Sequence, residues 1–196
     1  NPMISEIYIL GNDKIRANAI LESQSLVKGG FYSTNNLNAN IKLIKDYYLS
    51  KGYVDVSVEG SINEKDDNTV IVNYTINEGR QYKVRSVLFE GISGLSRDEL
   101  KKLLTTKEKS FFDGGNFIAS NMDADKTAIV NYYTTKGYPD AVITSSEVVP
   151  LDEESTDSTR YVNIVYTIDE GQLWTIGDIT FSGNTIFSSD DISSLI

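Results

Sequence analysis

The stretch Tyr47-Tyr48-Leu49-Ser50-Lys51-Gly52-Tyr53 decides the fold, because the chain contains a second version of it. It returns 85 residues later as Tyr132-Tyr133-Thr134-Thr135-Lys136-Gly137-Tyr138. From this stretch outward the two copies stay in register without a gap, over residues 28–58 and 113–143. Self-similarity of this length indicates that one folding unit occurs more than once in the chain.

Two further blocks repeat on either side of this stretch. Tyr74-Thr75-Ile76-Asn77-Glu78-Gly79 returns as Tyr166-Thr167-Ile168-Asp169-Glu170-Gly171, and an apolar block opens each unit at residues 4–11, 84–91 and 176–183. The separation between copies grows from 80 to 92 residues along the unit, so the insertions fall in connections, where a fold tolerates them. We therefore predict units over residues 1–80 and 81–172, and the truncated start of a third over residues 173–196.

Hydrophobic periodicity assigns five elements to the first unit. Alternating apolar residues predict strands, and apolar residues three or four positions apart predict an amphipathic helix. The predicted elements are, in chain order, a strand over Ile4–Leu10, a helix over Ile15–Leu21, a longer helix capped by Asn35 or Asn36 with Leu37, Ile41, Ile44 and Tyr48 on one side, and strands over Val54–Ser61 and Val70–Ile76. Gly52 is suited to end the longer helix, because glycine readily adopts the left-handed conformation.

The order strand, helix, helix, strand, strand predicts an α+β fold. Each βααββ unit is expected to be a three-stranded mixed sheet covered on one face by two helices, since the strands are apolar in alternation and the helices along one stripe. Pro139 and Pro150 flank the second strand predicted for the second unit, Ala141–Val149. Proline lacks a backbone donor, so this strand is predicted to lie at a sheet edge.

The composition excludes several classes of function. The chain of 196 residues has a net charge of −10, which repels phosphate backbones, so we expect no nucleic-acid partner. It contains no histidine and no cysteine, which removes the commonest general base and the strongest metal ligands. The acidic clusters Glu64–Asp67 and Asp152–Glu154 lack the spacing of a calcium loop. We therefore expect no catalysis, no metal site and no cofactor.

Three features together resemble the POTRA (polypeptide-transport-associated) domain. They are the Lys-Gly-Tyr-x-Asp joint at Lys51–Asp55 and Lys136–Asp140, the closing Ile-Asn/Asp-Glu-Gly at Ile76–Gly79 and Ile168–Gly171, and an opening strand that ends in Gly-Asn at Gly11-Asn12 and Gly183-Asn184. The second unit departs from the last feature, with Gly91-Ile92. The resemblance covers essentially the whole chain and points to the tandem POTRA domains of the BamA family of outer-membrane β-barrel assembly factors.

The resemblance implies a non-catalytic scaffold in the periplasm of a diderm bacterium, within an outer-membrane protein. Its partners would be unfolded outer-membrane β-barrel proteins and accessory assembly lipoproteins. The C-terminal membrane β-barrel of such a protein would lie outside this chain. The alternative is the periplasmic POTRA region of a two-partner secretion transporter or of a cell-division scaffold.

Two surfaces are candidates for binding a client polypeptide. An exposed edge strand can accept an added strand from a partner, which is known as β-augmentation. The candidate edge residues are Val54, Val56, Val58, Ala141, Val142 and Ile143. One tyrosine of each Tyr-Tyr pair must point away from the core stripe, which makes Tyr47 and Tyr132 candidates on the helix surface.

The remaining motif residues are interpreted as structural. They are Gly52, Tyr53, Gly79, Gly137, Tyr138 and Gly171. The connections between units are short, since Arg80 and Gln81 alone separate Gly79 from the next predicted strand. We expect such joints to make successive units bend at defined angles, across contacts that are small and polar.

Overall fold

A computed structural model of the chain describes residues 1–65, 67–183, 186, 188 and 190–191. Its strands form two separate three-stranded sheets. The first sheet and its helices comprise β1 (Met3–Leu10), α1 (Ala17–Glu22), α2 (Thr34–Ser50), β2 (Ser57–Glu64) and β3 (Thr69–Asn77). The second sheet and its helices comprise β4 (Gln81–Glu90), α3 (Arg97–Leu103), α4 (Ala119–Thr135), β5 (Val142–Pro150) and β6 (Thr159–Asp169). Below, these two groups are called the first and the second unit.

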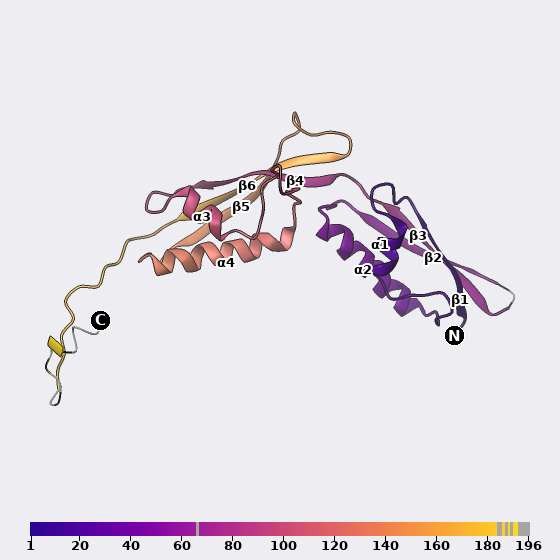
Figure 1. Cartoon of the computed structure of the whole chain (residues 1–196), viewed down its shortest axis with the longest axis horizontal. Helices are drawn as coiled ribbons and strands as arrows, with labels where there is room; N and C mark the ends of the chain where they lie inside the picture. Colours follow the sequence, from indigo (N-terminus) through magenta and orange to yellow (C-terminus); the bar gives the residue numbers. More distant parts are fainter. Residues whose placement is uncertain (66, 184–185, 187, 189, 192–196) are drawn as a thin grey trace.

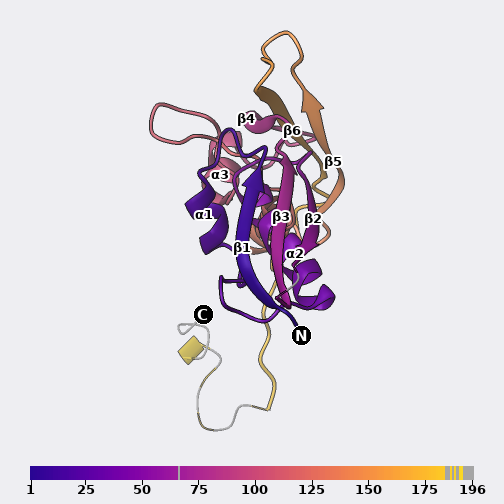
Figure 2. The same cartoon turned by 90° about the vertical axis from the view of Figure 1, so that its right-hand side faces the viewer.

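Both sheets are mixed and have the same topology. The strand orders are β1-β3-β2 and β4-β6-β5, and Figure 2 shows β3 of the first unit between β1 and β2. The first strand of each unit runs parallel to the last, and the second strand runs antiparallel to the last. Parallel pairing needs a crossover connection, which the two helices supply. The predicted α+β fold with βααββ units is confirmed.

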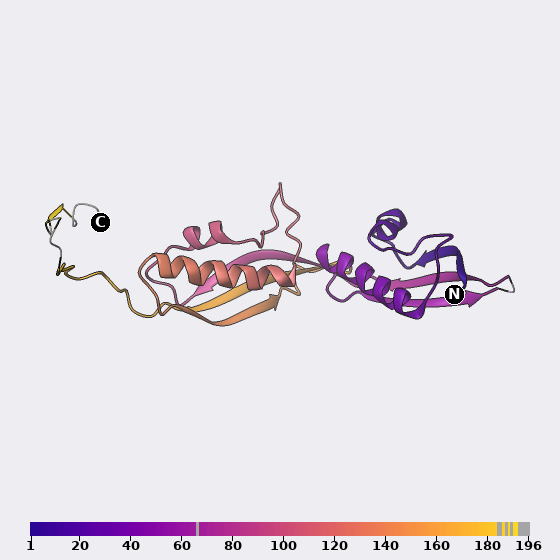
Figure 3. The ribbon, with the colours of Figure 1, turned by 90° about the horizontal axis from the view of Figure 1, so that it is seen from below.

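Both helices of a unit lie on the same side of its sheet (Figure 3). The side chains that the last strands turn toward the helices are fully or almost fully buried. They are Val70, Val72, Tyr74 and Ile76 in β3, and Val162, Ile164, Tyr166 and Ile168 in β6. The two sets belong to separate core clusters, so each unit closes over its own apolar interior.

The predicted apolar stripe of the long helix forms. α2 buries Leu37, Ile44 and Tyr48 against the sheet. Its start differs from the prediction, because Ser33 caps the helix instead of Asn35 or Asn36, and the Ser33 hydroxyl accepts a hydrogen bond from the Asn36 N–H. Serine and asparagine are about equally good caps, so residue preference did not separate these neighbouring positions.

The second strand of each unit begins later than predicted. β2 starts at Ser57 instead of Val54, and β5 starts at Val142 instead of Ala141. Residues 53–56 and 138–141 form turns that lead from the helix to the sheet, and Val56 is buried in the first of them. Alternating valines imitate a strand here, because the buried side of the turn also selects apolar side chains.

The strand predicted to open a third unit does not form. Residues 172–182 carry no helix or strand. In each complete unit the first strand is held by parallel pairing with the last strand of the same unit, and the described residues after Asp169 include no strand that could be such a partner. The helix predicted to follow falls mostly outside the described residues.

The two units lie end to end in an elongated molecule (Figure 1). Their contact has an apolar part, which corrects the expectation that the contact is small and polar. Val54 of the first unit packs against the core of the second unit. Beside it, a groove of about 290 Å³ is lined by Leu49 and Ser50 from the end of α2 and by Phe117 and Ile118 from the start of α4.

Candidate partner-binding site

The outer edge of β1 is partly covered by the loop that leads into α2. The Ile4 N–H donates to the Gly30 carbonyl (2.8 Å), and the Gly29 N–H donates to the Ile4 carbonyl (2.7 Å). A third bond joins the Tyr32 N–H to the Pro2 carbonyl (2.9 Å). These bonds occupy donors and acceptors that an incoming strand would need, so this part of the edge is closed to a partner.

The outer edge of β4 is covered in the same way. Val84 donates to the Gly115 carbonyl (2.7 Å) and accepts from the Lys109 N–H (2.8 Å). Farther along, the Val87 N–H donates to the Glu108 carboxylate (2.7 Å), which also binds Lys101 (2.7 Å). Burial alone would raise the pKa of Glu108, but the hydrogen bonds from Lys101 and Val87 lower it, so the carboxylate that caps this edge is ionised.

A register shift adds to this protection. The pairing of β1 with β3 shifts between Ile4 and Glu6, and that of β4 with β6 shifts between Val84 and Ser86. The pairing of β5 with β6 also shifts, between Ile143 and Ser145. A bulge bends a strand and interrupts the regular array of donors and acceptors. In β1 and β4 the bulge adds to the loop that covers the edge, whereas in β5 it leaves the stretch Ser145–Pro150 in regular pairing with β6.

The opposite edges belong to β2 and β5, and each of these pairs with one strand only. Beside β5 lies a groove of about 410 Å³ between the sheet edge and α4. Val142 and Ile143 line it from the sheet side, and Thr127 and Val130 line it from the helix side. Val142 is 50% exposed. An edge strand beside a partly apolar groove offers backbone partners and a side-chain pocket to an extended peptide.

The predicted edge residues are not all at an edge. Val142 and Ile143 lie on β5, and Val58 lies on β2 with its side chain packed against the core. The prediction of an edge position is wrong for three residues that precede their strands. Val54 packs against the second unit, and Val56 and Ala141 are buried (4% and 3% exposed).

The two tyrosine pairs are divided as predicted between the core and the surface. Tyr48 and Tyr133 are fully buried. Tyr47 and Tyr132 are half-buried, and each has a lysine from the next helical turn over its ring, with Lys51 at 5.2 Å and Lys136 at 5.1 Å from the ring centroid. Both outer tyrosines share this cation–π contact. Tyr132 in addition packs against the second core and donates a hydrogen bond from its hydroxyl to Glu99 (3.4 Å).

Glu78 and Glu170 have a role that the sequence interpretation missed. The Glu78 carboxylate accepts hydrogen bonds from the Lys14 N–H (2.9 Å), the Ile15 N–H (3.2 Å) and the Tyr48 hydroxyl (2.9 Å). It thereby ties the loop after β1 to the end of β3 and to α2. The signal was present, since the glutamate precedes glycine in both copies, but its partners lie at least 30 residues away.

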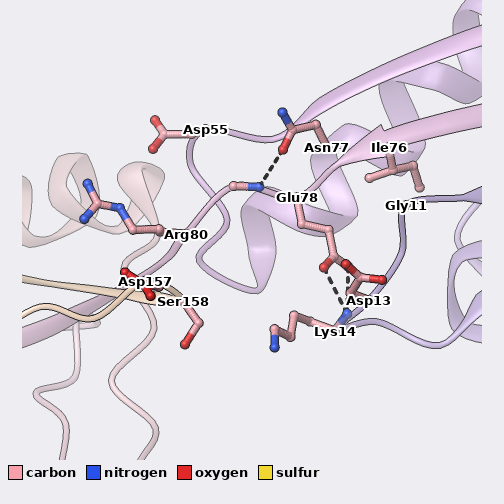
Figure 4. Close-up of a pocket in the computed structure, with 11 residues that line it drawn as sticks. Gly11, Asp13, Lys14, Asp55, Ile76, Asn77, Glu78, Arg80, Asp157 and Ser158 are labelled. Atoms are coloured by element: carbon pink, nitrogen blue, oxygen red, sulfur yellow. Dashed lines mark hydrogen bonds between the residues drawn. The ribbon is translucent and has the colours of Figure 1, made fainter.

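An open cleft of about 670 Å³ lies at the joint between the units (Figure 4). Asp55, Arg80 and Asp157 border it, and the close-up shows the Glu78 carboxylate bound to the Lys14 backbone. Within the described part of the chain, no three His, Cys, Asp or Glu side chains gather closely enough to hold a metal ion. No described helix is long and apolar enough to cross a membrane.

Both units match the model of one known protein family. The family model POTRA, described as "Surface antigen variable number repeat", matches residues 2–79 and 82–171. A Treponema pallidum protein named as an outer membrane protein assembly factor is 32% identical over 196 residues, which is 100% of this chain and 23% of that protein. The outer membrane protein assembly factor BamA of Neisseria meningitidis is 25% identical over 94% of this chain and 23% of the relative. The chain thus spans about a quarter of the length of these relatives.

Among solved structures, the Haemophilus influenzae BamA POTRA3-5 crystal structure is similar in fold. Its TM-score is 0.56 at 23% identity, over 98% of this chain and 76% of that one. The Haemophilus ducreyi BamA structure that lacks POTRA domains 1-3 has a TM-score of 0.55 at 21% identity, over 85% of this chain and 29% of that one.

Proposed function

Because this chain belongs to the POTRA family, we propose that it is a non-catalytic scaffold in the assembly of outer-membrane proteins. Its place would be the periplasm, within a longer outer-membrane protein. The names of its relatives in Treponema pallidum and Neisseria meningitidis support this role. The absence of histidine and cysteine from the sequence agrees with a binding function.

The clients in this proposal are unfolded outer-membrane β-barrel proteins, with accessory assembly subunits as further partners. Barrel strands are about ten residues long and alternate apolar with polar side chains. β5 has nine residues, of which Ser145–Pro150 pair with β6 without a register shift, so part of a barrel strand could pair along this stretch. The backbone hydrogen bonds of such a pair do not depend on the client sequence, which suits a factor that receives many clients.

The observation that carries the proposal is the asymmetry between the two edges of the second sheet. β4 has donors and acceptors already used by Gly115, Lys109 and Glu108. β5 has an edge beside a groove into which alternate side chains of a client could enter. Ordering an extended peptide costs about 1–2 kcal/mol per residue, so binding at one edge is expected to be weak.

The test uses a peptide of about ten residues with the alternation of a barrel strand, titrated against the chain by fluorescence anisotropy. Val142→Glu places a charge in the groove and should weaken binding at least about tenfold, which corresponds to ~1.4 kcal/mol. Leu88→Glu is the matched control, because Leu88 is a similarly exposed apolar residue (43%) on β4. Equal binding by both variants and the unmodified chain would overturn the proposed site.

A second peptide distinguishes backbone pairing from contact through side chains alone. Methylation of alternate peptide nitrogens removes the donors on one edge and keeps every side chain. We expect this peptide to lose binding. If it binds as well as the parent peptide, the helix surface at Tyr47 and Tyr132 becomes the preferred site, and Tyr132→Ala should then weaken binding.

A further inference from the structure

The Lys-Gly-Tyr-x-Asp motif lies where one unit ends and the next begins. In the first unit it covers Lys51–Asp55, directly after α2. Family resemblance and glycine preference explain it as a connection between a helix and a strand. Neither explains why the motif ends in aspartate in both copies, because Asp55 and Asp140 are exposed and lie outside both core clusters.

At the first joint the motif binds the start of the second unit. The Tyr82 N–H donates to the Gly52 carbonyl (2.7 Å), and the Tyr82 hydroxyl donates to the Asp55 carboxylate (3.1 Å). The Gln81 side-chain amide donates to the Lys51 carbonyl (2.8 Å). Two residues at the start of β4 are thus held by three groups of the motif.

At the second joint the same two bonds recur with a different aromatic residue. The Trp174 N–H donates to the Gly137 carbonyl (2.7 Å), and the Trp174 indole N–H donates to the Asp140 carboxylate (2.9 Å). Tyrosine and tryptophan share a ring with a polar hydrogen-bond donor at its rim. The pair of contacts therefore depends on that chemistry and not on one residue type.

The glycines of the motif allow this close approach. A Cβ atom on Gly52 would lie 2.8 Å from the Tyr82 carbonyl oxygen, and one on Gly137 would lie 2.9 Å from the Trp174 carbonyl oxygen. Real Cβ atoms essentially never approach backbone atoms this closely. Any side chain at either position would therefore push the next unit away from the motif.

Tyr82 is also anchored within its own unit. Its hydroxyl accepts a hydrogen bond from Arg160 on β6 (3.2 Å), whose guanidinium lies 5.7 Å from the centre of the Tyr82 ring. Arg160 is bound in turn by Asp152 (3.1 Å). A bond from Asp55 to Tyr82 therefore links the motif to the sheet of the second unit, so it constrains orientation as well as distance.

We infer that the Gly-Tyr-x-Asp loop of each unit is a docking site for the following unit. Its ligand is an aromatic side chain with an N–H or O–H donor at the start of the incoming segment. Because the first and second joints use the same two contacts, the motif should direct the start of each incoming segment in the same way. This inference does not rest on client binding at β5.

The first test measures the joint between the two complete units. The chain has no cysteine, so Lys45→Cys on α2 and Ala124→Cys on α4, both at exposed positions, place one spin label on each unit. Pulsed electron resonance then reports the distribution of label distances. We expect one narrow peak for the otherwise unmodified chain, and loss of that peak to a broad distribution for Tyr82→Phe and for Asp55→Ala.

Two controls separate docking from general damage. Tyr161→Phe removes the hydroxyl of another half-buried tyrosine, one that binds Lys109 within the second unit, and should keep the narrow peak. Asp55→Asn retains an acceptor oxygen and should also keep it. Folding of every variant is checked by its cooperative thermal unfolding. A narrow peak in folded Tyr82→Phe and Asp55→Ala would overturn the inference.

The second joint has its own readout, because Trp174 is the only tryptophan in the sequence. Trp174 is 62% exposed, so the readout is the mobility of its ring. Asp140→Ala should lower the anisotropy of its fluorescence, because the bond that fixes the ring is lost, while Asp140→Asn should change the anisotropy less. Identical anisotropy in all three chains would overturn docking at this joint. In either case the barrel-strand peptide is expected to bind as before, which separates this inference from the proposed function.

Discussion

At the scale of single residues, one buried carboxylate organises each unit. Glu170 accepts hydrogen bonds from the Ser93 N–H (2.9 Å), the Gly94 N–H (3.0 Å) and the Tyr133 hydroxyl (2.8 Å). Burial alone would raise the pKa of Glu170, but the hydrogen bonds from Ser93, Tyr133 and Gly94 lower it. The charged form is therefore the one that the folded unit stabilises.

This arrangement predicts a dependence of stability on pH. A carboxylate whose pKa is lower in the folded than in the unfolded chain stabilises the fold above the unfolded pKa, about 4.3 for glutamate, and loses that contribution as the pH falls through the folded pKa. Glu170→Gln should lower the free energy of unfolding at pH 7 by about 1–3 kcal/mol, since its amide cannot accept all of these bonds. The difference in free energy of unfolding between Glu170→Gln and the unmodified chain should become smaller below about pH 4.

The measurement is urea unfolding of both chains across this pH range. Glu153→Gln, at an exposed position in the β5–β6 connection, is the control and should change the free energy of unfolding at pH 7 by less than about 0.5 kcal/mol. A gap between Glu170→Gln and the unmodified chain that stays constant down to acid pH would contradict the assigned role of the carboxylate.

At the scale of elements, each long helix carries one polar residue on its buried face. In α4 the Asp125 carboxylate accepts hydrogen bonds from the Thr105 N–H (2.6 Å), the Thr106 N–H (3.3 Å) and the Tyr166 hydroxyl (3.5 Å). In α2 the equivalent Asn40 accepts from the Ser25 N–H (2.5 Å). In both units this polar side chain accepts hydrogen bonds from backbone N–H groups of the segment between the two helices. These N–H groups have no partner within either helix.

We therefore expect aspartate and asparagine to be interchangeable at position 125 of α4. An apolar residue at this position should destabilise the unit. Asp125→Leu should lower the free energy of unfolding by about 2–3 kcal/mol, because it buries unpaired N–H groups. Asp125→Asn should cost about 1 kcal/mol or less, since an amide oxygen serves this role at Asn40. Urea unfolding measures both. Equal losses for the two variants would show that the backbone bonds to Asp125 contribute nothing specific.

At the scale of the whole molecule, two separate cores are joined by a small contact. Each sheet pairs only strands of its own unit, and the buried residues fall into two clusters. Val54 is the residue of the first unit that packs against the second core. We propose that the boundary near residue 80 separates two units that fold independently and that stabilise each other weakly.

This proposal predicts that residues 81–171 fold alone. The fragment should give dispersed amide resonances and a cooperative urea transition, because it retains its sheet, both helices and its core. Its midpoint should lie below that of the same unit in the whole chain, since the packing of Val54 and the bonds from Gln81 and Tyr82 to the motif are lost. A fragment without dispersed resonances would show that the two units form one cooperative structure.

The sequence by itself determined the repeat, the order of elements and the composition of each core. Strand and helix periodicities are local properties, so the residues of β3 and the stripe of α2 could be predicted from positions two, three or four residues apart. The same reasoning placed Val54 and Val56 on a strand, because local alternation is identical in a buried turn and in a strand.

Only the tertiary structure decided which surfaces are open and what the repeated motif binds. The edge of β4 is closed by Glu108, 21 residues from its partner Val87, and the Asp55 carboxylate meets Tyr82, 27 residues away. Glu78 and Tyr48 are 30 residues apart. No periodic pattern connects such positions, because their proximity depends on how the helices cross the sheet and how one unit follows the next. The contacts at the joint therefore form only when both units are folded and lie next to each other.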